Sequence, residues 1–354
     1  MHKNDNINQF MRVSMHILAI ESSCDETAVA VYRASDNKIF DNIHSQACEH
    51  ARHGGVVPEL AARDHQEKIV KVCQKTLIQA QIELSDIDAF AYTKGPGLVG
   101  PLLIGCSFTK ALAAACRRPV LPIHHLEAHL CIAKYVFSEL DFPFLALLVS
   151  GGHTAIIKAH ALGKYEILGE TLDDAAGEAF DKGAKVLGLE YPGGPSIARA
   201  AQMYKKEYKR PSLPQPMSKK KTLNFSFSGL KTAFNQAWQA SYHSEEARYA
   251  FAYSLQETIT DNLISKVRIA MQQEQGLPWV VAGGVAANKS MRSKLDKLKE
   301  VTGCCMYYPP AELCTDNAAM IAYTAFLKIQ SGQNNVTDSK AFADVLPRWS
   351  IDQL

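Results

Sequence analysis

Residues 16–32 read HILAIESSCDETAVAVY, two apolar runs separated by a short polar turn. Apolar runs of this length, bounded by polar residues, predict a buried strand, a tight turn and a returning strand. The same design returns about 130 residues later, where residues 144–159 read FLALLVSGGHTAIIKA. Two copies of one hairpin predict an internal duplication and therefore two related lobes.

Strands and helices alternate in the rest of the sequence. We expect further strands at 88–93, 120–123 and 279–282, and helices at 57–79, 101–116, 174–187, 195–204, 246–273, 288–300 and 314–329. Mixed elements over 354 residues indicate an α/β protein with two domains.

The lobes are expected at 15–130 and 131–330, with the C-terminal helix completing the first. An N-terminal extension, 1–14, precedes them, and a tail, 331–354, follows. The clearest irregular insertion is 205–222, which is rich in Lys, Pro and Ser.

The net charge of +2 neither requires nor excludes a nucleic-acid partner, because charge can be clustered. Two basic runs, at 205–210 and 219–221, flank a Pro-rich stretch. They fit a solvated surface loop and a loop that contacts phosphates equally well.

The cysteines and the apolar runs indicate the cellular compartment that we expect for the protein. Nine cysteines without a CxxC pair argue against a disulfide framework or a four-cysteine zinc site, and favour reduced thiols in the cytoplasm. We expect no membrane-spanning helix, because no apolar run approaches ~18 residues. Residues 1–12 are polar and lack the apolar core of a signal peptide.

Residues 95–100, GPGLVG, match the GxGxxG pattern of dinucleotide-binding turns. The following strand, however, ends in His124 and not in the acidic residue that would hold a ribose. We therefore favour a glycine turn that packs a helix on a strand.

Residues 124–129, HHLEAH, follow a strand and open a helix. His125 and His129 are four residues apart and share one helix face, which is metal-ligand spacing. A zinc peptidase needs glutamate directly after the first histidine, but Leu126 stands there. Two histidines and a distant carboxylate would suit iron or zinc; a pair of capping or core histidines fits equally well.

Two strands end in paired glycines, at 148–154 (LVSGGHT) and 281–288 (VAGGVAAN). Such turns let backbone N–H groups approach a phosphate, and the second opens a helix whose N-terminus favours an anion. Their combination favours a nucleotide site.

Acidic residues gather at 173–182, DDAAGEAFDK. Asp173 or Asp174 fits a helix cap, and Glu178 and Asp181 share one face that is solvated by default. Asp316 fits the start of the last helix, where an acidic residue is favourable. It becomes a candidate functional residue only in combination with the histidines.

Taken together and in order, these motifs resemble the TsaD family, the universal tRNA threonylcarbamoyladenosine transferases once called O-sialoglycoprotein endopeptidases. The resemblance runs from Ile17 to Tyr323. It is carried by IESSCDET (20–27), GGVVPELAAR (54–63), KGPGL (94–98), HHLEAH (124–129), VSGGHT (149–154), DDAAGEAFDK (173–182), FSFSGLKT (225–232) and AGGVAAN (282–288).

The resemblance implies a duplicated, two-lobed actin-like ATPase (ASKHA) fold. It implies one divalent metal ion, Fe²⁺ or Zn²⁺, on His125, His129 and Asp316, and places the catalytically required acids Asp25 and Glu26 at the first turn. It also implies contacts to an ATP- or AMP-type nucleotide or substrate from Leu148, Val149, Ser150, Gly151, Gly152, Asp181, Gly194 and Asn288.

The implied reaction moves the threonylcarbamoyl group of threonylcarbamoyl-AMP to N6 of adenosine 37 in tRNAs that read codons beginning with A. The implied partners are tRNA, the synthase that makes the donor and, in a bacterium, a TsaB-like inactive paralogue and a small TsaE-like ATPase. A homodimer also fits.

Three other functions remain open on the sequence. The histidine pair and the old family name point to a metal-dependent peptidase, although Leu126 argues against it. A plain actin-like ATPase would hold magnesium through phosphates and carboxylates and would not need the histidines. A non-catalytic interaction subunit would not need intact metal ligands.

Overall fold

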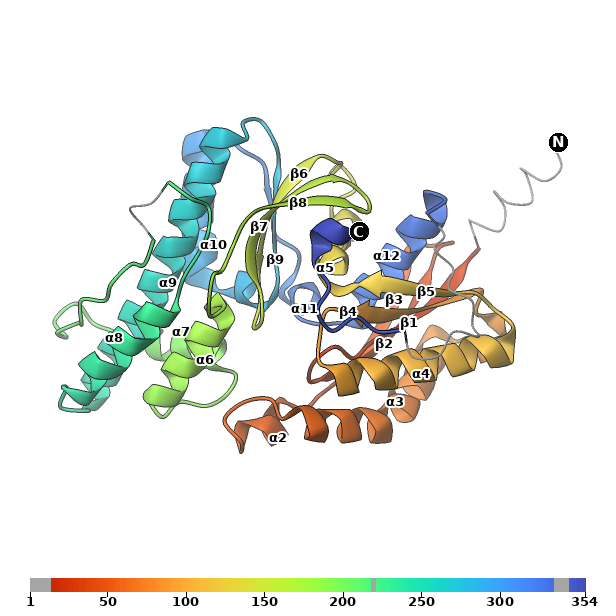
Figure 1. The fold of residues 1–354 in the computed structure, drawn as a ribbon, viewed down its shortest axis with the longest axis horizontal. Coiled ribbons are helices and arrows are strands. Elements are labelled where there is room, and N and C mark those ends of the chain that lie inside the picture. Colours follow the sequence, from red (N-terminus) through yellow and green to blue (C-terminus); the bar gives the residue numbers. More distant parts are fainter. Residues whose placement is uncertain (1–13, 218–220, 334–343) are drawn as a thin grey trace. The chain divides into compact units, whose positions relative to one another are not determined.

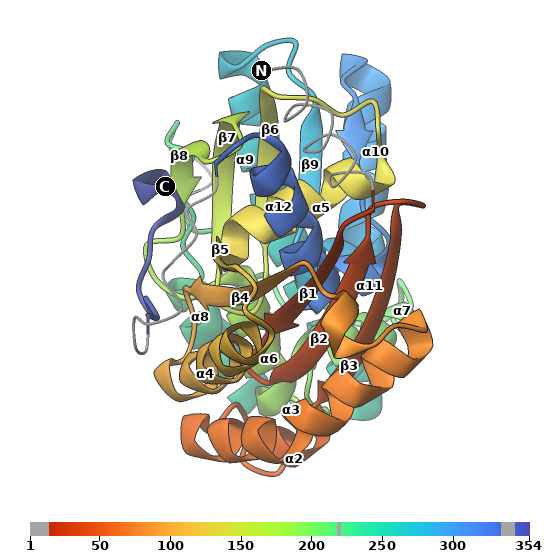
Figure 2. The same cartoon turned by 90° about the vertical axis from the view of Figure 1, so that its right-hand side faces the viewer.

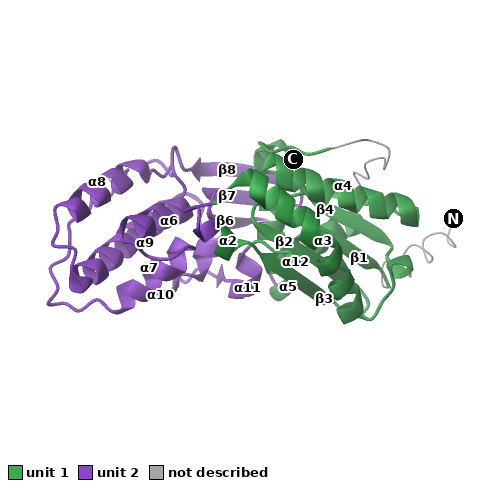
Figure 3. Ribbon diagram, turned by 90° about the horizontal axis from the view of Figure 1, so that it is seen from below, with its two compact units in different colours: residues 1–49, 56–136, 316–354 green, residues 50–55, 137–315 purple. Residues whose placement is uncertain are grey.

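A computed structural model of the chain describes residues 14–217, 221–333 and 344–354. It contains two compact units (Figure 3). Unit 1 comprises Met1–Glu49, Val56–Val136 and Asp316–Leu354, and unit 2 comprises His50–Gly55 and Phe137–Thr315. The predicted N-terminal extension lies outside the described residues except for Ser14, as do three residues of the insertion and much of the tail.

The first hairpin forms the centre of the sheet of unit 1. The strands are β1 (His16–Glu21), β2 (Glu26–Arg33), β3 (Lys38–Ser45), β4 (Ala89–Gly95) and β5 (Val120–His124), in the order β3-β2-β1-β4-β5. β1 pairs antiparallel with β2 and parallel with β4, and β4 pairs parallel with β5. The parallel strands end at one edge of the sheet, where the following turns gather.

Helices cover both faces of this sheet (Figures 1 and 2). α3 (Pro58–Ala80) and α4 (Val99–Cys116) pack on one face, and α5 (His125–Val136) and α12 (Ala318–Gln330) on the other. Most residues of β1, β2 and β4 are buried on both faces because helices cover both. The core below α3 and α4 includes Leu18, Val29 and Phe90.

The sheet of unit 2 repeats this topology. Its strands are β6 (Phe144–Val149), β7 (Thr154–Ala161), β8 (Lys164–Glu170), β9 (Trp279–Ala282) and β10 (Met306–Tyr307), in the order β10-β9-β6-β7-β8. An antiparallel hairpin is again followed by two parallel strands on the side of its first strand. The duplication predicted from the two hairpins is therefore confirmed.

The helices of unit 2 build one large core with its sheet. They are α6 (Ala176–Val186), α7 (Gly193–Gln202), α8 (Ser228–Gln239), α9 (Glu245–Gln273), α10 (Lys289–Thr302) and the short α11 (Ala311–Cys314). Phe180, Phe225, Phe234 and Trp279 are almost completely buried in this core.

Several elements differ from the sequence-based expectation. The edge strands β3 and β8 and the helix α8 were not predicted, because their apolar residues are few and polar residues face solvent on one side. The last helix begins at Ala318 and not at 314, since the Asn317 side chain accepts the Met320 N–H as its N-cap. Along the chain the compact units change at 136 and 315, and α12 packs on β1, β2 and α5 of unit 1.

The C-terminal residues 344–354 lie across the ends of β4 and β5. The Leu346 N–H donates to the Lys94 carbonyl at 2.8 Å, and the Lys94 Nζ pairs with Asp344 at 2.7 Å. The Trp349 carbonyl lies 3.0 Å from Nε2 of His124. This segment thereby contacts the last residue of β5, which immediately precedes α5.

One helix of the described residues, α4, is apolar and long enough to cross a membrane by length and composition alone. It packs against β4 and α3, with Leu102, Cys106 and Ala113 buried and Lys110 within its length. This packing is that of a helix that covers a sheet.

Candidate metal centre and nucleotide-binding turns

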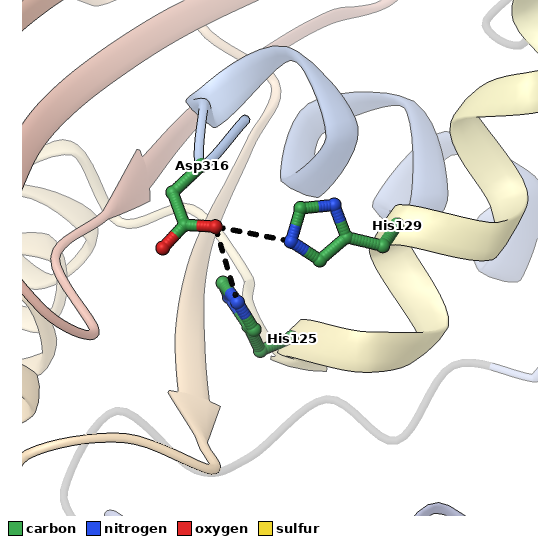
Figure 4. Close-up of side chains that lie close together, drawn as sticks. All are labelled: His125, His129 and Asp316. Atoms are coloured by element: carbon green, nitrogen blue, oxygen red, sulfur yellow. Dashed lines mark hydrogen bonds and ion pairs between the residues drawn. The ribbon is translucent and has the colours of Figure 1, made fainter. Parts of the chain in front are cut away.

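The structure brings together His125, His129 and Asp316, and Figure 4 shows both imidazole rings facing one carboxylate. The Asp316 Oδ1 lies 3.1 Å from Nε2 of His129 and 3.5 Å from Nε2 of His125. One ligand atom from each residue lies within 4.8 Å of the other two. Two imidazole nitrogens and one carboxylate oxygen form the facial set that suits iron or zinc and leaves positions open for substrate.

Local structure places the three side chains. β5 runs directly into α5, and Nδ1 of His124 accepts the Leu126 N–H at 3.2 Å, which caps the helix. Four residues make about one helical turn, so His125 and His129 point the same way. Asp316 immediately precedes the Asn317 cap of α12, which holds its backbone in place.

Glu21, at the end of β1, supports the metal site from behind. Its fully buried carboxylate lies 3.0 Å from Nδ1 of His125 and accepts the Ser23 N–H at 2.6 Å and the Thr93 hydroxyl. A carboxylate on the far nitrogen of a ligating histidine fixes its tautomer and leaves the lone pair of Nε2 for the metal. The sequence analysis did not single out Glu21; its position in a buried strand beside the polar turn was the available signal.

The electrostatics of the cluster suit a cation. Burial opposes ionisation of Asp316, but His125 and His129 hold the pKa of that carboxyl well below its usual value. Burial likewise opposes the charged form of His125, but Glu21 and Asp316 outweigh it and raise the pKa of the imidazole well above its usual value. A divalent ion prefers ionised carboxylates and neutral imidazoles as donors, so a bound ion would replace the proton that His125 holds in its absence. Nδ1 of His129 is buried without a hydrogen-bond partner among the described residues.

The turn between β1 and β2 carries Asp25 and Glu26. Burial, together with Asp25 and then Asp316, raises the pKa of Glu26 well above its usual value. His65 on α3 holds this turn, because its ring nitrogens lie 2.7 Å from the Thr27 hydroxyl and 3.0 Å from the Cys24 carbonyl. His65 is fully buried and was not singled out in the sequence, where it reads as one polar residue on an amphipathic helix.

The 95–100 glycine turn packs against the first turn. The Leu98 N–H donates to the Ser23 carbonyl at 2.8 Å, and a Cβ on Gly97 would lie 2.6 Å from that oxygen. A Cβ on Gly105, eight residues further on, would lie 2.2 Å from Oγ of Ser22. These glycines are needed for contact between protein segments, as predicted, and the dinucleotide interpretation is not required.

The paired glycines of unit 2 build a second turn. Gly283 directly follows β9 in the sequence and has a φ of +90°. It lies so close to the end of β6 that a Cβ would be 2.5 Å from the Val149 carbonyl oxygen. A Cβ on Gly151 or Gly152 would contact nothing within 4 Å, so this backbone has open space beside it. The side chains of Leu148 and Val149 are completely buried in the sheet, which leaves ligand contact to the exposed end of the turn.

Two more of the proposed nucleotide residues stabilise helix ends in unit 2. Asp181 accepts the Gly193 N–H at 2.7 Å at the start of α7, and a Cβ on Gly194 would meet open space. Asn288 caps α10 by accepting the Met291 N–H at 3.1 Å, and its amide donates to Gln256 at 3.0 Å. The starts of α7 and α10 therefore present backbone N–H groups beside these residues.

The acidic cluster at 173–182 divides between two tasks. Asp173 caps a helix, but the helix is α8, more than fifty residues away: its carboxylate accepts the Phe227 and Ser228 N–H groups at 2.7 and 3.1 Å. Glu178 pairs with Lys182 at 2.5 Å on the surface of α6, as expected for a solvated face.

Glu127 takes no part in the metal cluster. Its side chain is fully buried and lies 2.8 Å from Nζ of Lys328 on α12. The only glutamate within the histidine motif is thus committed to an ion pair between α5 and α12, and the catalytic base of a zinc peptidase is missing at this motif.

Comparisons with known proteins identify the family of the chain. A sequence profile of the TsaD family, described as tRNA N6-adenosine threonylcarbamoyltransferase, matches residues 38–323. Relatives of that name from Legionella pneumophila strains Corby and Paris are each 47% identical over 339 residues, which is 95% of this chain and 100% of theirs.

Solved structures support the fold. Full-length HypF in its phosphate- and nucleotide-bound form matches with a TM-score of 0.59 and 12% identity over 92% of this chain and 48% of that chain. Component A of (R)-2-hydroxyglutaryl-CoA dehydratase from Acidaminococcus fermentans matches with a TM-score of 0.52 and 15% identity over 89% of this chain and 100% of that chain. Both have the actin-like ATPase fold, so the predicted ASKHA fold is confirmed. With the profile match and the near full-length relatives, the chain belongs to the TsaD family of tRNA N6-adenosine threonylcarbamoyltransferases.

Proposed function

We propose that this chain is a tRNA N6-adenosine threonylcarbamoyltransferase that moves the threonylcarbamoyl group of threonylcarbamoyl-AMP to N6 of adenosine 37. The observation that carries the proposal is the family match over nearly the whole chain in a protein whose histidine–aspartate cluster is complete. The acceptor is a weakly nucleophilic exocyclic amine and the donor is a mixed anhydride. Catalysis therefore requires positioning of both substrates and stabilisation of developing negative charge.

His125, His129 and Asp316 would hold one divalent ion, with Fe²⁺ preferred over Zn²⁺. A bound ion at this position would act as a Lewis acid that grips and polarises the donor. Glu21 keeps the His125 ring oriented, and the capped starts of α5 and α12 keep the ligands in register. Two of the three ligands thus lie on the helix α5, and the third lies in the short turn before α12.

Asp25 and Glu26 are proposed as the catalytic acids of unit 1. A raised pKa, caused here by burial and by Asp25, is a common feature of carboxyl groups that transfer protons in catalysis. Glu26 is therefore our candidate to take the proton of the attacking amine, and Asp25 to keep its environment negative.

The glycine turn 150–152, with Asp181, Gly194 and Asn288, is proposed to hold the AMP part of the donor. Backbone N–H groups at glycine turns and helix starts bind phosphate without side-chain charge. Gly151, Gly152 and Gly194 have the open space on their Cβ side that close approach of a ligand needs.

The two rival enzymes are less well supported. A peptidase lacks its base, because Leu126 occupies that position and Glu127 pairs with Lys328. A plain ATPase gives no role to the paired imidazoles.

The proposed partners are tRNA, the synthase that makes the donor and, in a bacterium, TsaB-like and TsaE-like proteins; a homodimer is a further proposal. All nine cysteines are free, which fits the proposed cytoplasmic location.

The test is reconstitution with tRNA, threonine, bicarbonate, ATP and the synthase, with and without accessory proteins, followed by mass spectrometry of the nucleosides. The proposal predicts threonylcarbamoyladenosine with the wild-type chain and none with His125→Ala. Nucleotide hydrolysis without any modified adenosine, in both conditions, would support the plain ATPase instead.

A further inference from the structure

The connection between α7 and α8 carries an unusual local charge. We call residues 204–217 the basic strap; it holds Lys205, Lys206, Lys209 and Arg210 against a single acid, Glu207. All four cations are exposed. The whole chain has a net charge of only +2, so this concentration is local.

No carboxylate of the described residues neutralises these charges in an ion pair. Among the described residues, none of the four cations forms an ion pair, whereas Lys158, Lys182 and Lys294 of the same unit all pair with carboxylates. Unpaired, clustered cations attract polyanions, and the attraction depends strongly on salt.

The strap is nevertheless held firmly, although it contains neither helix nor strand. It runs beside α9 (Figure 1), and three polar side chains of that helix bind its backbone carbonyls. Ser254 donates to Pro211 at 3.2 Å, Asn262 to Pro216 at 2.8 Å and Lys266 to Met217 at 2.8 Å. The three donors are eight and four residues apart, which places them along one side of the helix.

Lys266 is the most deeply buried of the α9 side chains that bind this segment. It is completely buried, and its ammonium also donates to the Thr222 carbonyl at 2.8 Å. A buried ammonium is costly unless its donors are satisfied, and here two backbone carbonyls near the end of the insertion accept from it. The conformation of the strap is therefore specified by the core.

Aromatic rings lie among the cations. Tyr204 stacks on Tyr253 with ring centroids 4.3 Å apart, and the Arg210 guanidinium lies 5.8 Å from the centre of the Tyr253 ring. The Lys205 ammonium lies 6.0 Å from the centre of the Tyr208 ring. Cations that bind phosphates beside tyrosines that stack on bases or riboses are typical of RNA-binding surfaces.

We propose that the basic strap binds the sugar–phosphate backbone of the substrate tRNA. This inference rests on the proposed function, which makes a tRNA the acceptor, and adds the surface that contacts it. The tyrosines favour RNA over an acidic protein as the partner, because a carboxylate-rich surface would offer nothing to stack on them. Lys221, which is exposed beyond the strap, extends the same charge.

The test compares two variants that each remove four positive charges. One replaces Lys205, Lys206, Lys209 and Arg210 with Ala. The control replaces the exposed Lys71, Lys75, Lys297 and Lys299 with Ala. Fluorescence anisotropy gives the Kd for unmodified tRNA between 50 and 300 mM salt, and a transfer assay gives KM for tRNA and kcat. Circular dichroism and thermal melting verify folding.

We expect the Kd of the strap variant at ~150 mM salt to rise about tenfold or more, and the slope of log Kd against log salt to fall by about 2 to 4. KM for tRNA should rise with little change in kcat, and the triple variant Lys205→Arg, Lys206→Arg, Lys209→Arg should bind as the wild type does. A Kd and slope unchanged in the strap variant, or changed equally in the control, would overturn the proposal. Binding is measured without catalysis, so absence of modified adenosine with the wild type would count against the proposed function alone.

Discussion

In the proposed metal site, Glu21 is the residue that orients the His125 ring. Glu21→Gln keeps an oxygen near His125 but removes the charge that stabilises the ring, so we expect metal affinity to fall about 10- to 100-fold. Competition with a chromophoric chelator measures this affinity for Zn²⁺ or Co²⁺. Asp36→Asn removes an equal charge from an exposed loop and should leave the affinity unchanged. Equal affinities for the wild type and Glu21→Gln would show that Glu21 does not support the ligand.

Glu26 allows the proton-transfer role to be separated from binding. Glu26→Gln has nearly the same shape but cannot accept a proton, so transfer should fall by at least about 10²-fold. Metal content and nucleotide affinity, measured by metal analysis and calorimetry, should remain as in the wild type. If either binding property falls with the rate, Glu26 binds substrate or metal and the general base lies elsewhere.

At the scale of residues, the sequence could predict the metal trio only through the family resemblance. The spacing of His125 and His129 gave one helix face, but nothing local linked them to Asp316, which lies 187 residues beyond His129. Glu21 and His65 escaped notice because their roles arise when β1, α3 and α5 meet in the folded unit. Asp173 was expected to cap a nearby helix, and only the fold shows that it caps α8.

At the scale of elements, the start of α12 depends on Asp41 in the edge strand β3. Its carboxylate accepts the Ala318 N–H, while its Oδ1 is buried without a hydrogen-bond partner in the described part of the chain. Burial raises the pKa of Asp41 to about 7, although the bond to Ala318 works in the opposite direction.

This pKa predicts a pH dependence of stability. The folded state binds the proton more tightly than the unfolded state, whose value is 3.8, so the stabilisation is complete below pH ~4 and is lost as pH rises through about 7. Asp41→Asn keeps an acceptor for Ala318 and removes the ionisation. At pH 8 it should raise the free energy of unfolding by about 2 to 4 kcal/mol, and it should flatten the profile between pH 4 and 8. Urea denaturation at several pH values measures both; identical profiles for the two proteins would refute the assignment.

Strands formed by continuous apolar runs were predictable, whereas the edge strands of mixed polarity, β3 and β8, were not. β6 and β9 were predicted at their observed bounds, because continuous apolar runs mark strands buried on both faces. β3 and β8 lie at sheet edges with mixed polarity, and α8 owes its start to a carboxylate from another segment. Contacts with segments that are distant in the sequence determine such elements, and the local sequence pattern contains no information about those contacts.

At the scale of the whole molecule, the two units share one topology but carry different side chains at equivalent turns. The turn after β1 carries acids and lies beside the metal ligands, whereas the turn after β6 carries glycines with open space. The two copies of the hairpin were enough to predict the duplicated topology, because the hairpin forms the centre of each sheet. The side chains that differ between the units could be assigned functions only because the motifs that contain them occur along the chain in the order typical of one family.

The most direct test of the central claim is the metal dependence of threonylcarbamoyl transfer in a single turnover. The chain would be stripped with a chelator and supplied with tRNA, preformed threonylcarbamoyl-AMP and any accessory proteins that wild-type activity requires, with and without added Fe²⁺ or Zn²⁺. His129→Ala would be treated identically. We predict that modified adenosine forms only when metal is restored to the wild type, and that His129→Ala binds little metal and stays inactive. Full transfer by the stripped wild type, or by metal-free His129→Ala, would contradict the account.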